Sequence, residues 1–109
     1  MNVVFSKNIR KYFRDLVPIL YEKGYFILFD TAEKYVYELF DDITINLPTK
    51  QHKPAPAYFD KYGKNMYYAI FKKNRRTSWY VFFKTSRKDG EVIYKILYIA
   101  NNHTVAHHI

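Results

Sequence analysis

The chain has 109 residues, of which 49% are apolar, so it can bury one hydrophobic core but not two, and we expect a single domain over residues 1–109. It contains no cysteine, which excludes a disulfide framework and a cysteine-based zinc site. No segment approaches the roughly 20 apolar residues that span a bilayer, and we expect a cytoplasmic protein that is not associated with a membrane.

The net charge of +8 is unevenly distributed along the chain. Residues 1–48 contain 6 Lys/Arg and 7 Asp/Glu, whereas residues 49–109 contain 12 and 3. A basic half of this kind attracts anionic partners, although lysine and arginine also serve simple solubility. Among nucleic acids, acidic proteins and anionic membranes, we favour RNA as the partner.

Two helices are expected in the N-terminal half. The first covers residues 6–23, begins at Ser6 as a cap and ends at Gly24. Pro18 lies within it, which predicts a kink or a break into two pieces. One face of this helix is apolar and carries Ile9, Phe13, Leu16 and Leu20.

The second helix follows after a short connection at residues 25–29, which favours an antiparallel helical hairpin. Its N-terminal cap is expected at Asp30, with Glu33 able to reach back, and Pro48 ends it. Its apolar stripe consists of Val36, Leu39, Phe40, Ile43 and Leu47.

The second half predicts a loop followed by strands. Residues 49–64 have no sustained period and contain Pro54 and Pro56, so we expect a surface loop. Runs rich in aromatic and β-branched residues then occur at 66–71, 77–84 and 91–99, separated by a polar break at 74–76 and a tight turn at Asp89–Gly90.

The resulting fold class is α+β, with an N-terminal helical hairpin packed on a three- to four-stranded antiparallel sheet. The hairpin is the only expected cover for this sheet, so one face should stay exposed to solvent. Trp79, Val81 and Phe83 should point to one face, and Tyr80, Phe82 and Lys84 to the other.

A cluster of cations around the first polar break is the first candidate site. It contains Lys72, Lys73, Arg75 and Arg76, with the aromatic residues Tyr67, Tyr68, Trp79 and Tyr80 on either side. Cations bind phosphates and aromatic faces stack on unpaired bases, so this mixture suits single-stranded RNA. The alternative is a solvated hairpin turn with half-buried aromatic side chains.

The C-terminal segment is the second candidate site, with Asn101 and Asn102 followed by His103, His107 and His108. Histidine is a general acid or base near neutral pH, and RNA cleavage needs a base for the 2′-hydroxyl and an acid for the departing 5′-oxygen. That route needs no metal, and we expect no cofactor. A weak metal site at His103 and His107, or a tail without a role, are the alternatives.

The order of these elements, the segment Arg75–Phe83 (RRTSWYVFF) and the segment Tyr98–His103 (YIANNH) resemble the RelE/HigB-type toxins of bacterial toxin–antitoxin systems over most of the chain. In that family two N-terminal helices pack on an antiparallel sheet. The proteins cut messenger RNA on the ribosome until a cognate antitoxin covers them.

The resemblance implies roles for both candidate sites. The basic residues Lys72, Lys73, Arg75 and Arg76 would hold the substrate and stabilise the phosphate charge, with Arg76 as a catalytic cation. His107 or His108 would take the acid/base position, and His103 with Asn101 and Asn102 would stand where members carry a polar active-site residue. The chain departs from the family in ending with histidines instead of a tyrosine or basic residue, and in its longer loop at Pro54 and Pro56.

Three functions therefore remain open. The first is an endoribonuclease toxin, and the second is a non-catalytic module that uses Tyr68, Trp79 and Tyr80 to bind RNA or an acidic protein. The third is a toxin directed at DNA gyrase, because ParE-like proteins share the fold without cutting RNA.

Overall fold

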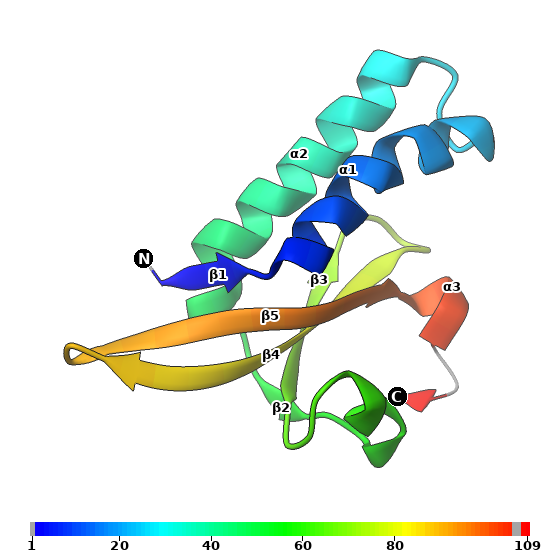
Figure 1. Ribbon diagram of the computed structural model, residues 1–109. Coiled ribbons are helices and arrows are strands. Elements are labelled where there is room, and N and C mark those ends of the chain that lie inside the picture. Colours follow the sequence, from blue (N-terminus) through cyan, green and yellow to red (C-terminus); the bar gives the residue numbers. More distant parts are fainter. Residues whose placement is uncertain (1, 106–107) are drawn as a thin grey trace.

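A computed structural model describes residues 2–105 and 108–109 and shows two helices packed on a five-stranded mixed sheet (Figure 1). The strands lie in the order β1-β5-β4-β3-β2. The elements are β1 (Val3–Phe5), α1 (Lys7–Glu22), α2 (Phe29–Asn46), the 3-10 helix η1 (Leu47–Thr49), β2 (Lys53–Pro54), the 3-10 helix η2 (Ala57–Tyr62), β3 (Tyr67–Lys72), β4 (Ser78–Lys88), β5 (Glu91–Asn101) and α3 (Asn102–Val105).

The α+β class, the helical hairpin and the three central strands are confirmed, whereas the predicted strand number and purely antiparallel pairing are wrong. β1 pairs with β5 in parallel, with Val3 opposite Tyr94. β2 pairs with β3 through two residues, and its Pro54 lacks a backbone N–H, so this strand is confined to an edge. The two strands that were not predicted, β1 and β2, are too short to show an alternating pattern of apolar and polar residues in the sequence.

The helix ends agree only in part with the prediction. The backbone N–H of Ile9 donates to Ser6 Oγ at 3.4 Å, which confirms the cap of α1. Pro18 lies inside α1 and does not divide it. In α2 the cap position is occupied by Leu28, without a side-chain hydrogen bond, so the predicted cap at Asp30 is wrong and Asp30 lies in the first turn.

Both faces of the sheet are covered, so the prediction of one solvated face is wrong. Trp79, Val81 and Phe83 of β4 point toward α1 and α2 and join the larger core. On the opposite face Phe82 packs with Phe59 of η2, and both side chains are fully buried. The alternation predicted for β4 is therefore confirmed, and the segment predicted as a surface loop supplies the second cover.

The predicted tight turn after β4 is confirmed by positive φ angles of 52° at Asp89 and 81° at Gly90. Beyond Thr85, which lies opposite Tyr94, the paired strands β4 and β5 continue without β1 as a ribbon that extends past the body of the molecule (Figure 1). In residues 2–105 and 108–109, neither long helix has the apolar character needed to cross a membrane.

Candidate nucleic-acid interface

The turn between β3 and β4 lies beside the end of β5, because Trp79 at the start of β4 pairs with Asn101 at the end of β5. This arrangement brings together the two segments that the sequence singled out. We call the resulting group the turn site, and it consists of Arg75, Arg76, Thr77, Asn101, Asn102 and His103.

Asn102 ties the two segments together through its side-chain amide. Its Oδ1 accepts a hydrogen bond from the backbone N–H of Ser78 at 2.9 Å, and its Nδ2 donates to the backbone carbonyl of Arg76 at 3.0 Å. Both bonds go to the backbone, so Asn102 fixes the shape of the turn and is not itself directed at a ligand.

His103 is exposed and held in place from both sides. Its backbone N–H donates to Asn101 Oδ1 at 2.9 Å. Its ring Nε2 lies 3.3 Å from the hydroxyl oxygen of Thr77, within hydrogen-bonding distance. An exposed imidazole in a fixed place beside a cationic turn is suited to proton transfer.

The turn itself is shaped by Asn74. Its Oδ1 accepts hydrogen bonds from the backbone N–H groups of Arg76 and Thr77, both at 2.9 Å. Arg75 and Arg76 are exposed, and neither belongs to the two ion pairs found in the described residues, Lys11–Asp15 and Lys34–Glu38. Two arginines are therefore exposed on the turn whose Thr77 contacts His103.

The two predicted lysines of the cluster, Lys72 and Lys73, differ in their surroundings. Lys72 is exposed at the end of β3, opposite Ser78, and adds to the charge of the turn site. Lys73 is half-buried and its Nζ lies 5.4 Å from the ring centroid of Tyr35 on α2. This cation–π contact directs Lys73 toward the helices.

Of the three aromatic residues expected to bind bases, only Tyr80 is not buried. Trp79 is 1% exposed and its Nε1–H donates to the Tyr35 hydroxyl at 2.9 Å. Tyr68 is 6% exposed and packs in the second core, whereas Tyr80 is half-buried at the margin of that core.

His52 and His108 lie away from the turn site. His108 stacks on Tyr58 of η2, with ring centroids 3.6 Å apart and an interplanar angle of 2°. His107 lies outside the described residues. His52 packs edge-on against Phe83, and its Nε2 lies 2.9 Å from the carbonyl oxygen of Leu47, so it is part of the core packing.

Tyr98, in a pair of stacked tyrosines near η2, offers no base at neutral pH. Tyr98 stacks on Tyr62 with ring centroids 3.7 Å apart. Burial, and then the hydrogen bond with Tyr62, raise the pKa of Tyr98 above its ordinary range. The phenol therefore stays protonated, and the pair stabilises the fold around η2.

A pocket at the edge of the sheet was missed by the sequence analysis. It has a volume of about 230 Å³ and is lined by Lys50, Gln51, Lys53, Tyr68 and Ile70. We call it the lysine pocket. Its cations come from the segment predicted as a plain loop, where the pattern TKQHK was the available signal.

The lysine pocket and the turn site lie along the same strand. Tyr68, Ile70 and Lys72 alternate with the helix-facing residues of β3 and share the second face. Tyr80 pairs with Ile70 across the strands and lies between the two sites. From Tyr68 to Lys72 the strand rises by about 13 Å, which equals the rise of about four stacked nucleotides.

Within residues 2–105 and 108–109, no group of three or more His, Asp or Glu side chains is placed to hold a metal ion. In comparisons with known proteins, no family model, curated protein or solved structure matches the chain.

Proposed function

We propose that the chain binds single-stranded RNA along β3 and cleaves it at the turn site. The single observation that carries this proposal is the position of His103, exposed and hydrogen-bonded beside a turn that presents two arginines. The lysine pocket, Tyr80 and Lys72 extend the basic surface away from that point.

Cleavage would proceed by attack of the 2′-oxygen on the neighbouring phosphorus. His103 takes the proton of the 2′-hydroxyl, a bond forms between that oxygen and phosphorus, and the bond to the 5′-oxygen breaks. Arg75 and Arg76 stabilise the charge on the phosphate oxygens. Solvent water protonates the departing 5′-oxygen, which leaves a 2′,3′-cyclic phosphate and a 5′-hydroxyl.

We also propose the substrate and the partner protein that the RelE/HigB resemblance implies. The substrate is messenger RNA, bound on the ribosome, and a cognate antitoxin neutralises the protein by covering its basic surface. An acidic segment of the antitoxin would bind this surface, because acidic segments bind basic surfaces in preference to neutral ones.

The experiment is an RNA cleavage assay in the presence of EDTA, with labelled single-stranded RNA and with a translating extract. We expect the wild-type chain to cut in at least one of the two, with cyclic phosphate ends. The variants His103→Ala and Arg75→Ala/Arg76→Ala should lose most of the rate, by about a hundredfold or more for the histidine. The matched control Arg87→Ala/Lys88→Ala removes the same charge from the far end of the ribbon and should cut normally.

Two results would contradict the assignment. If His103→Ala cuts at the wild-type rate while His107→Ala/His108→Ala does not, the base lies in the terminal histidine pair. If the wild-type chain cuts neither substrate, the nuclease proposal is wrong.

A non-catalytic RNA-binding module is the second candidate, favoured by one observation. His103 is the only histidine of the described residues at the turn site, and its neighbours Asn101 and Asn102 use their side chains for structural hydrogen bonds. This candidate predicts RNA binding that weakens steeply with salt, without cleavage. A toxin directed at gyrase would instead damage DNA on expression and leave RNA intact.

A further inference from the structure

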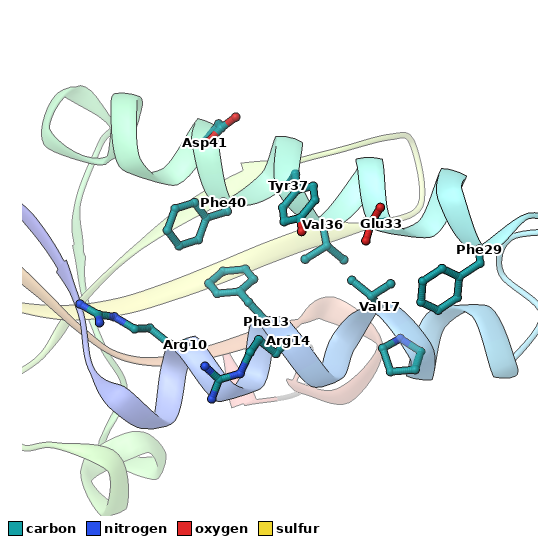
Figure 2. A pocket seen from close by; sticks show the side chains of 11 residues that line it. Arg10, Phe13, Arg14, Val17, Phe29, Glu33, Val36, Tyr37, Phe40 and Asp41 are labelled. Atoms are coloured by element: carbon teal, nitrogen blue, oxygen red, sulfur yellow. The ribbon is translucent and has the colours of Figure 1, made fainter.

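The outer side of the helical hairpin contains a groove that neither the turn site nor the lysine pocket uses. It has a volume of about 530 Å³ and lies between α1 and α2 (Figure 2). The side chains at its base are apolar and come from both helices, namely Phe13, Val17, Val36 and Phe40. We call it the interhelix groove.

Large apolar side chains continue from this groove onto the connection between the helices. Phe29, which lines the groove, is 45% exposed, and Tyr37 is 61% exposed. At the connection Ile27 is 93% exposed and Leu28 is 63% exposed. A contiguous apolar surface of this kind marks an interaction site on a protein that must remain in solution.

The charges on the two sides of the groove differ in sign. Arg10 and Arg14 line it from α1, whereas Glu33 and Asp41 line it from α2 (Figure 2). None of these four takes part in the ion pairs found in the described part of the chain. The groove thus has one basic side and one acidic side, each with unpaired charge.

We propose that two copies of this chain associate through their interhelix grooves, with α1 of each copy lying on α2 of the other. A two-fold axis parallel to the helices produces this contact and places the basic side of each groove on the acidic side of its partner. Arg10 then lies at the level of Asp41 of the partner subunit, because the two residues occupy the same end of the antiparallel hairpin.

The other face-to-face arrangement is disfavoured by charge. A two-fold axis perpendicular to the helices would place α1 on α1 and bring Arg10 and Arg14 against the same arginines of the partner. Like charges facing one another across an interface oppose association. The charge pattern therefore selects a single self-complementary dimer.

The arrangement with α1 on α2 of the partner subunit also matches a common mode of helix packing. Each helix has an antiparallel neighbour within its own hairpin and another in the partner, as in an up-down four-helix bundle. The helix α1 has 16 residues and is about 24 Å long, which provides a continuous contact. Both exposed connections lie at the same end of the dimer, where Ile27 and Leu28 lose solvent contact.

The test is a charge exchange between two variants of the full chain, followed by sedimentation velocity. The wild-type chain should sediment as a dimer of twice 13.2 kDa in a concentration-dependent manner. Arg10→Glu alone and Asp41→Arg alone each place like charges across the interface, and each should dissociate about tenfold more readily. An equimolar mixture of the two variants restores both opposite-charge pairs and should recover the dimer.

The matched control is Lys7→Glu, which reverses an exposed charge on α1 outside the groove and should leave the dimer intact. Far-ultraviolet circular dichroism of each variant confirms that the helices are formed. A wild-type chain that remains monomeric at all concentrations would assign the groove to a different protein and overturn the proposal. Dimerisation of the wild type without recovery in the mixture would place the interface elsewhere and would also overturn it.

Discussion

Asn102 at the start of α3 accepts a hydrogen bond from the backbone of Ser78 at the start of β4, at 2.9 Å. The two residues are distant in sequence, and the bond joins the end of one strand to the start of its neighbour. Through its second bond, to the carbonyl of Arg76, the same amide holds the arginine-bearing turn against the segment that carries His103.

Replacing Asn102 with alanine should therefore weaken RNA binding without changing the charge of the protein. Both backbone groups lose their partner, which should lower the free energy of unfolding by about 1–3 kcal/mol. The measurements are urea unfolding and RNA affinity under conditions where the variant is fully folded. Asn8→Ala, at an exposed position of α1, is the control. Unchanged RNA affinity in the folded Asn102 variant would show that the geometry of the turn does not matter for binding.

Lys50 and Lys53 should act as phosphate contacts if RNA follows β3 into the lysine pocket. Each contact with a single strand contributes about 0.7 to the slope of log affinity against log salt. The variant Lys50→Ala/Lys53→Ala should therefore show a shallower slope, by about 1.4. Arg87→Ala/Lys88→Ala removes the same charge from the far end of the ribbon and should retain the wild-type slope. Equal slopes for the two variants would indicate a nonspecific effect of net charge.

Trp79 and Tyr80 are adjacent in β4 but should respond in opposite ways to substitution. Trp79→Phe removes the hydrogen bond to Tyr35 and part of the buried ring, so we expect the free energy of unfolding to fall by about 1–3 kcal/mol with RNA affinity retained. Tyr80→Ala should weaken RNA binding by about 1–3 kcal/mol, the usual contribution of one stacked base. Thermal unfolding and titration with a short RNA separate the two effects. Loss of RNA affinity in Trp79→Phe but not in Tyr80→Ala would contradict both expectations.

Alkaline unfolding should depend on Tyr12. Burial raises the pKa of its phenol to about 12, against an ordinary value of 10.0. Below pH 10 the phenol is protonated in both the folded and the unfolded chain. Between pH 10 and 12 it ionises only when the chain unfolds, so stability falls by about 2 kcal/mol over this interval. Tyr12→Phe should show a smaller loss across the same interval in urea unfolding, and an identical pH profile would contradict this origin.

Periodic segments of the sequence predicted their structure well, because one face of each is buried. The apolar stripe of α2 and the alternation in β4 are patterns of this kind. The strands β1 and β2 have three and two residues, and their pairing depends on the neighbouring strand instead of on a local pattern. The cover of the second face was missed for a similar reason, since η2 is anchored by the single fully buried side chain of Phe59.

The turn site was predictable as two separate segments but not as a single constellation. The cations near Arg75 and the polar residues near His103 were evident from composition, while their contact depends on the register between Trp79 and Asn101. The accessibility of the aromatic residues was not predictable. A tryptophan or tyrosine in a strand suits a core as well as a base-stacking surface, and only the packing on each face distinguishes the two.

The parallel pairing of β1 with β5 has a consequence for how the protein is made. Val3 is synthesised 91 residues before its partner Tyr94. The earlier strand β1 must therefore wait for the later strand β5, and this pairing joins residues that are distant in sequence. His103 comes after β5, so the turn site cannot assemble on a nascent chain that is still short of its last strand.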